Sequence, residues 1–301
     1  MANYLDKFIA QDDLMTKGMS ACKGCGAEMI LRRVIRLAGP NTVMMIPPGC
    51  MAGSGVIGSE DKTGMKIPVT ISLLDNPASM AAGVSRMYEH AGRPDVNVIA
   101  FAGDGATADA GFQALSGAAE RGEKILYICY DNEGYMNTGY QRSSTTSYGS
   151  RTSTTPIGSV LKGKPQPSKF LPLIVMMHNP EYMATISPSN MPDMVNKIEK
   201  ALEASKRGFA YLHAFSGCPT GWGYAENLAI HYSRGAVQSN LFPLMEYENG
   251  KLILKKSSKK LPIADYIKGV TKFKHFTQEM IDELQSEVDR RMALLEKLAR
   301  D

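Results

Sequence analysis

The stretch Val96-Asn-Val-Ile-Ala-Phe-Ala-Gly-Asp104-Gly105 decides the fold of this chain. Residues 96–102 form an almost continuous apolar run, which is typical of a strand buried on both faces of a parallel sheet. We expect a helix over 109–120 and a second buried strand over 124–130. This order predicts a βαβ unit with a right-handed crossover, so both strands end at one edge of the sheet, where open α/β sheets bind ligands.

The pattern on both sides of this unit indicates an α/β fold, a mostly parallel sheet flanked by helices. Further helices are predicted over 28–37, 77–91, 171–177, 190–206, 225–238 and 277–300, and further strands over 42–46, 69–74, 183–186 and 209–215. Asn249-Gly250 predicts a hairpin between strands over 245–248 and 251–254. The Gly-rich, polar segment 51–66 is expected to be a loop.

Size and composition are typical of a globular protein. Apolar residues make up 44% of the 301 residues, charged residues make up 21%, and the net charge is +4. The sequence has no apolar run long enough for a membrane span, no apolar leader and no basic stripe interleaved with aromatic residues. We expect a cytoplasmic protein that binds neither membrane nor nucleic acid. We divide it into a main domain over 1–240, with an irregular N-terminal arm, and a C-terminal hairpin and helix extension over 241–301.

Two polar motifs follow the central strands and predict a metal-bound diphosphate. Gly103 and Gly105 let the backbone approach phosphate groups closely, and Asp104 between them offers a hard oxygen ligand. Asn132, 28 residues after the aspartate, offers an amide oxygen, and the Gly134 carbonyl completes the protein ligands of a Mg²⁺-like ion. This spacing across a βαβ unit is the layout of a thiamine diphosphate site. Another phosphate ligand and a purely structural turn are the alternatives.

Four of the five cysteines lie in predicted loops and form a candidate metal-binding set. Cys22 and Cys25 make a C-x₂-C pair, while Cys50 and Cys218 lie far along the chain next to glycine or proline. Four thiolates suit a tetrahedral zinc or a [4Fe–4S] cluster. Spacing does not separate these two, and free thiols are a third interpretation. Cys129 lies inside an apolar strand, which indicates a small buried hydrophobe.

The segment 139–169 is dominated by Ser, Thr, Gly, Arg and Tyr. It is too polar to build a core and is long for a connection between two elements. Such a segment is typical of a site cover or a partner-binding loop, and a plain surface excursion is the alternative.

Together these motifs resemble the beta subunit of the pyruvate:ferredoxin oxidoreductase family, the 2-oxoacid:acceptor oxidoreductases. The resemblance runs from Cys22 to Trp222 and includes the segment Tyr135-Met-Asn-Thr-Gly-Tyr-Gln141. It implies the thiamine-diphosphate-binding fold, with Asn137 as the catalytic residue beside the thiazolium and the substrate. The implied [4Fe–4S] ligands are Cys22, Cys25, Cys50 and Cys218, and the implied Mg²⁺ ligands are Asp104, Asn132 and Gly134. The implied cofactor-binding residues are Gly103, Asp104, Gly105, Asn132, Gly134, Asn137 and Thr138.

This resemblance implies a beta subunit that oxidatively decarboxylates a 2-oxoacid and passes single electrons to the proximal cluster and on to ferredoxin. Pyruvate is the first expectation, with oxalate or phenylglyoxylate possible, and coenzyme A takes the acyl group in pyruvate-type enzymes. Alpha, gamma and delta-type subunits are the expected partners. The alpha subunit usually supplies the glutamate that activates thiamine, so the chain alone should be inactive.

Three departures from the pyruvate pattern border the expected substrate position and leave the identity of the 2-oxoacid open: Pro47-Pro48, Tyr140 and the segment after Gln141. The alternative function is a non-redox thiamine diphosphate decarboxylase or synthase subunit with a structural zinc. A non-catalytic scaffold stabilised by zinc is a third hypothesis.

Overall fold

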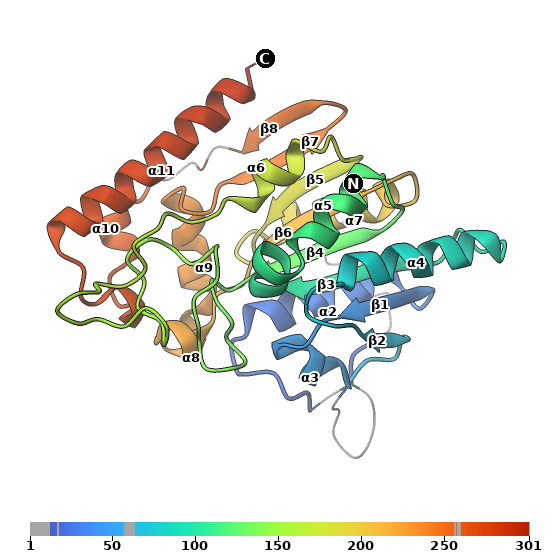
Figure 1. Ribbon diagram of the computed structural model, residues 1–301, viewed down its shortest axis with the longest axis horizontal. Coiled ribbons are helices and arrows are strands. Elements are labelled where there is room, and N and C mark those ends of the chain that lie inside the picture. The colour runs from blue at the N-terminus through green and yellow to red at the C-terminus, as the bar shows by residue number, and fades with distance from the viewer. Residues whose placement is uncertain (1–12, 17, 57–63, 256, 258–259, 301) are drawn as a thin grey trace.

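The protein was analysed as a computed structural model, which describes residues 13–16, 18–56, 64–255, 257 and 260–300. The described residues contain an eight-stranded sheet in the order β2-β1-β3-β4-β6-β5-β7-β8 (Figure 1). The first six strands of this order are parallel, and β7 and β8 are antiparallel additions at one edge. The strands are β1 Thr42–Ile46, β2 Val69–Ile71, β3 Asn97–Gly103, β4 Leu126–Asp131, β5 Tyr182–Ile186, β6 Ala210–Phe215, β7 Leu244–Glu248 and β8 Lys251–Lys255.

Helices cover both faces of this sheet, because its central strands are continuously apolar and successive side chains point to opposite sides. Leu126 and Ile128 of β4 join the core beneath α2 (Gly26–Ala38) and α7 (Met191–Ala204). Tyr127 and Cys129 join the opposite core, beneath α4 (Pro77–His90), α5 (Phe112–Glu120) and α6 (Leu171–Met176). The prediction that Cys129 is a buried hydrophobe is confirmed, because it is completely inaccessible.

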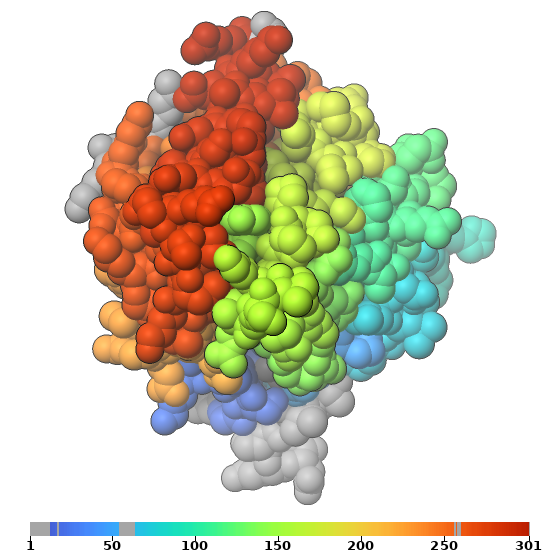
Figure 2. Space-filling model, turned by 60° about the vertical axis from the view of Figure 1, so that its left-hand side comes forward, coloured from blue at the N-terminus to red at the C-terminus, as the bar shows by residue number. Residues whose placement is uncertain are grey.

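Helices of the C-terminal third lie beside the sheet (Figure 1), and their side chains form a third core rich in aromatic residues. Its elements are α8 Pro219–Trp222, η2 Glu226–Leu228, α9 Ala229–Gln238, α10 Ile263–Tyr266, η3 Thr271–Phe273 and α11 Gln278–Leu298. The predicted hairpin is confirmed, and its first strand pairs with β5. Figure 2 shows α11 lying along the segment 140–169 on the molecular surface. Within the described residues, no helix combines the length and the apolar character that a membrane span needs.

Most predicted elements are present, and two predictions need correction. The start of the segment predicted as a loop over 51–66 is instead the helix α3, Cys50–Val56, while residues 57–63 lie outside the described part of the chain. Met51 explains the helix, because this side chain is buried in the core beneath α2. The helix expected over 109–120 is preceded by a π-helix, η1, over Gly105–Ala110. π-Helices are rare and frequently occur at functional sites.

Candidate active site

The carboxyl ends of β3 and β4 lie side by side, because Gly103 pairs with Tyr130 in the parallel register. Asp104 and the turn Asp131–Gly134 therefore meet at one edge of the sheet. Asp104 is fully buried, and one of its carboxylate oxygens accepts a hydrogen bond from the Asn132 backbone N–H at 3.3 Å. The packing explains the glycine at 105, because a Cβ there would clash with the ring of Tyr135.

Three polar groups meet at this edge around the side chain of Asn132. Its terminal amide atom lies 3.0 Å from Asp104 Oδ1 and 2.8 Å from the Gly134 carbonyl oxygen. A nitrogen at this position donates to both acceptors. An oxygen there would present three acceptors to a bound cation. Neighbouring oxygens around an octahedral Mg²⁺ are about 2.8–3.0 Å apart, given metal–oxygen bonds of about 2.0–2.1 Å, so both separations match those between neighbouring ligands of the ion.

Electrostatics at this edge favour a bound cation. Burial, followed by the nearby charge of Asp131, raises the pKa of Asp104 well above its usual range. Burial also acts to raise the pKa of Asp131, but hydrogen bonding and charge from His213, whose Nε2 lies 2.9 Å away, lower it overall. Asp131 therefore stays ionised through its histidine partner, while Asp104 needs a positive charge to do the same.

A pocket of about 160 Å³ opens beside these groups. Its lining includes six residues predicted to bind the cofactor or the metal: Gly103, Gly105, Asn132, Gly134, Asn137 and Thr138. Asn137 and Thr138 are exposed, so a ligand reaches them without a change in the core. The Tyr135 hydroxyl donates to the Gly105 carbonyl at 3.1 Å and ties the segment that carries Asn137 to the β3 end.

Three separate segments bring the four predicted cysteine ligands to the same end of the molecule. Cys25 precedes α2, Cys50 begins α3, and Cys218 precedes α8. The Cys25 N–H donates to the Cys22 carbonyl at 3.1 Å, which closes the C-x₂-C turn. Burial, followed by the nearby thiols of Cys25, Cys218 and Cys22, raises the pKa of Cys50 to about 12. All four thiols therefore lie within electrostatic reach of one another.

The cysteine group adjoins the pocket at two points. Cys50 is itself a lining residue of the pocket. On the other side, Met136 lines the pocket and contacts Gly221, where a Cβ would stand 3.3 Å from Cys218 Sγ. Among the described residues, no three Cys, His, Asp or Glu side chains converge as the ligands of a single metal ion do.

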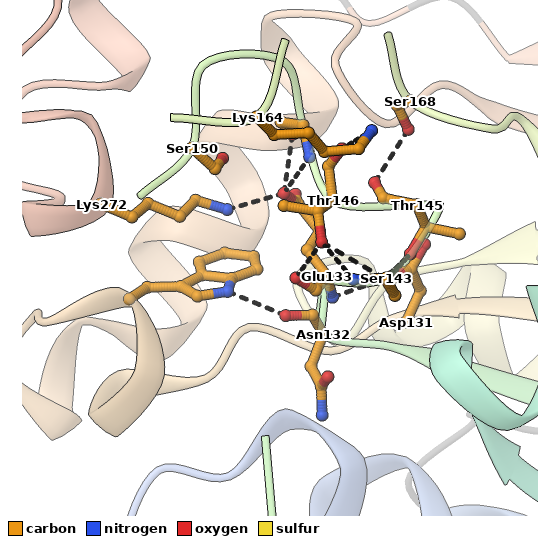
Figure 3. A network of polar contacts seen from close by, with 12 residues as sticks. Asp131, Asn132, Glu133, Ser143, Thr145, Thr146, Ser150, Lys164, Ser168 and Lys272 are labelled. Atoms are coloured by element: carbon orange, nitrogen blue, oxygen red, sulfur yellow. Dashed lines mark hydrogen bonds and ion pairs between the residues drawn. The ribbon is translucent and has the colours of Figure 1, made fainter. Parts of the chain in front are cut away.

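The long polar segment lies over the turn Asp131–Glu133, as Figure 3 shows, and it also contacts Asp104. Ser143 Oγ donates to Asp104 Oδ2 at 2.5 Å, and Thr145 Oγ1 lies 2.9 Å from both Asp104 and Asp131. Lys164 is 1% exposed, and its Nζ donates to four backbone carbonyls between residues 144 and 167. The hydroxyls hold the segment against the site, and the lysine holds the segment together in place of a hydrophobic core.

Sequence reasoning missed a buried ion pair behind the Asn132–Gly134 turn. Lys272 Nζ lies 2.8 Å from Glu133 Oε2, and the side chains are 0% and 7% exposed (Figure 3). Lys272 also stands 3.6 Å above the ring of Trp222, whose indole N–H donates to the Asn132 carbonyl at 2.9 Å. Glu133 has a φ of 61°, in the left-handed region that non-glycine residues rarely adopt. The positive φ is not readable from the sequence, and no local motif announces a partner 139 positions away.

The fold and this edge of the sheet define the class of thiamine-diphosphate-dependent enzymes. The family described as thiamine pyrophosphate enzyme, C-terminal TPP binding domain, matches residues 49–214, more than half of the chain. A solved structure, 2-oxoglutarate:ferredoxin oxidoreductase from Magnetococcus marinus, shares the fold with a TM-score of 0.59 and 20% sequence identity, covering 90% of this chain and 94% of that one.

Curated relatives narrow this class. The chain is 45% identical to NADH-dependent phenylglyoxylate dehydrogenase subunit beta of Aromatoleum evansii, over 99% of this chain and 67% of the relative. It is 40% identical to pyruvate synthase subunit PorB of Methanothermobacter thermautotrophicus (93% and 96% covered), and 37% identical to ketoisovalerate oxidoreductase subunit VorB of Pyrococcus furiosus (94% and 92% covered). The chain belongs to the beta subunits of the 2-oxoacid:ferredoxin oxidoreductases, which oxidise 2-oxoacids with thiamine diphosphate. The predicted fold class and family are confirmed.

Proposed function

We propose that this subunit holds Mg²⁺–thiamine diphosphate and a [4Fe–4S] cluster side by side, and that it oxidises a monocarboxylic 2-oxoacid within a larger complex. The observation that carries the proposal is the meeting of Asp104 Oδ1, the Asn132 amide and the Gly134 carbonyl beside the pocket. When bound, thiamine diphosphate supplies a nucleophilic carbon and an electron sink for decarboxylation. The chain supplies the metal ligands, and Asn137 faces the space beside them.

The cysteine geometry favours a cluster over zinc. Tetrahedral zinc with Zn–S bonds of about 2.3 Å requires sulfurs about 3.8 Å apart. Among the described residues, no such convergence of three ligands exists, although the four thiols influence one another electrostatically. A four-iron cluster spaces its thiolates more widely, so Cys22, Cys25, Cys50 and Cys218 fit it better. The cluster supplies a one-electron store next to the pocket.

The lining of the pocket bears on the substrate. Pro48, Leu74, Tyr130 and Met136 contribute apolar surface, and the described lining contains no lysine, arginine or histidine from this chain. A second carboxylate on the substrate would find no positive partner there. A 2-oxoacid with an apolar side chain therefore suits this subunit, with pyruvate and phenylglyoxylate as the representatives that its relatives name.

The remaining parts of the proposal concern partners. Alpha, gamma and delta-type subunits complete the complex, ferredoxin accepts electrons, and coenzyme A takes the acyl group if the substrate is pyruvate. The naming of the relatives as subunits supports such a multi-subunit complex.

Anaerobic purification of the native complex tests the proposal. We expect bound thiamine diphosphate in the denatured extract, iron and sulfide in equal amounts, and a broad visible absorption that dithionite bleaches. A cluster-free, zinc-loaded preparation would overturn the redox function and favour the non-redox alternative. In a panel of 2-oxoacids with a viologen dye, 2-oxoglutarate should be the poorest substrate. Rates with pyruvate no higher than with the other acids would remove the pyruvate assignment.

A further inference from the structure

Tyr224 has a buried hydroxyl that finds no hydrogen-bond partner among the described residues. The residue is 9% exposed and lies just after the α8 turn that follows Cys218. An unpaired buried hydroxyl costs about 1–3 kcal/mol, so such groups are rare unless a bound group completes the hydrogen bond.

The backbone next to two predicted cluster ligands encloses this hydroxyl. A Cβ at Gly217, the residue before Cys218, would stand only 2.6 Å from the phenolic oxygen. The Gly217 carbonyl accepts a hydrogen bond from the Gly26 N–H at 3.3 Å, immediately after Cys25. Glycine at 217 thus leaves room for the hydroxyl between the Cys25 and Cys218 segments.

The C-x₂-C turn of Cys22 and Cys25 also packs against the segment that follows Cys218. Gly24, inside that turn, packs against the backbone of Glu226, where any side chain would clash with the carbonyl. Electrostatics agree with this placement, because burial and then the thiols of Cys218 and Cys25 raise the pKa of Tyr224. The hydroxyl therefore faces the space that the cysteines share.

Packing limits where the Tyr224 hydroxyl can point. The ring lies edge-on to Trp222 with centroids 6.1 Å apart, and it lies 4.7 Å from the Tyr232 ring. A tyrosine held on two sides has its oxygen in a defined position before any cofactor binds.

We propose that the Tyr224 hydroxyl donates a hydrogen bond to a sulfur of the cluster and raises its reduction potential. The inference rests on the proposed function, since it requires the cluster at the four cysteines. A donor of this kind stabilises the extra negative charge of the reduced cluster more than it stabilises the oxidised form. Tyr224 thereby helps to set how readily the cluster accepts an electron from the neighbouring site.

The test compares Tyr224→Phe with wild type in the anaerobically purified complex. Tyr266→Phe is the matched control, because its hydroxyl is also buried and unpaired among the described residues, but the charged and titratable groups near it are Glu133 and other tyrosines rather than cysteines. A redox titration followed by electron paramagnetic resonance measures the reduction potential of the cluster. The potential should be lower in Tyr224→Phe than in wild type by about 59 mV, which for a one-electron couple is an about tenfold loss of preference for the reduced cluster. Tyr266→Phe should leave the potential unchanged.

A second measurement keeps the inference testable if Tyr224→Phe disturbs the fold. In wild-type complex exchanged into deuterated water, pulsed resonance should detect an exchangeable deuteron close to the cluster. Two results would refute the hydrogen bond and leave the proposed function standing. One is the absence of that deuteron, and the other is an equal reduction potential in Tyr224→Phe and wild type with iron and sulfide retained. A wild-type complex that contains no iron overturns the proposed function itself, and the two failures are thus distinguishable.

Discussion

Replacing Lys272 with methionine should destabilise the subunit far more than removal of an ordinary surface charge. The substitution keeps the length of the side chain but leaves the Glu133 carboxylate buried, where its remaining partners among the described residues are the N–H and hydroxyl of Ser147 at 3.0 and 2.7 Å. Breaking a buried pair by removing one partner costs about 3–5 kcal/mol, because the remaining charge is uncompensated. Burial lowers the pKa of Lys272, so desolvation already offsets part of the pair's stabilisation. We therefore expect a loss near 3 kcal/mol.

The assay is urea-induced unfolding followed by the fluorescence of Trp222, the single tryptophan of the chain, which lies directly under the Lys272 ammonium. Lys268→Met is the control, since its ion pair with Asp265 is exposed and worth about 1 kcal/mol or less. The double variant Glu133→Gln/Lys272→Met removes both charges and should recover at least half of the loss. A cost of Lys272→Met no larger than that of Lys268→Met, or strict additivity in the double variant, would refute the reasoning.

Four further predictions concern the site and its cover. Thr145→Val removes a hydroxyl 2.9 Å from both buried aspartates, so affinity for Mg²⁺–thiamine diphosphate should fall about 10–100-fold by calorimetry. Cys50→Ala should abolish iron binding, whereas Cys129→Ala should retain the iron content of wild type. Asn137→Ala should lower turnover without changing the melting temperature, because the side chain is exposed. Burial lowers the pKa of Lys164 from 10.5 to about 8. Between these two pH values the unfolded state therefore binds more protons than the folded state. As pH rises through this window, the free energy of unfolding of wild type should increase relative to that of Lys164→Met. Urea unfolding midpoints of both proteins, measured on either side of pH 8, check the direction of this change. A midpoint of wild type that falls relative to that of Lys164→Met as pH rises would contradict the prediction.

The position of the site follows from two buried strands that the sequence itself identifies. The apolar runs before Gly103 and Asp131 are long enough to identify two buried parallel strands, and parallel strands with a crossover helix end at one edge. Asp104 and Asn132 were therefore predictable neighbours. The C-x₂-C pair and the other two loop cysteines were likewise predictable as candidates, although their meeting depends on the fold.

Other features escaped local reasoning. The helix that begins at Cys50 was predicted as a loop, because Gly-rich composition hid the one side chain, Met51, that anchors it in the core. The cover over Asp104 has no periodicity, since Ser143 ties it to Asp104 and Lys164 cross-links it internally through hydrogen bonds to its own carbonyls. The insertion of β6 between β4 and β5 in the sheet was also not readable from chain order.

The sequence by itself determined the strands, most helices and the identity of the candidate ligands, because periodicity, glycine turns and ligand chemistry act over a few neighbouring residues. Only the tertiary structure decided which distant groups complete the site. Glu133 and Lys272 are 139 positions apart, and Asp131 and His213 are 82 apart. A buried charge is stable only beside its partner, and that partner is chosen by packing in space rather than by position along the chain.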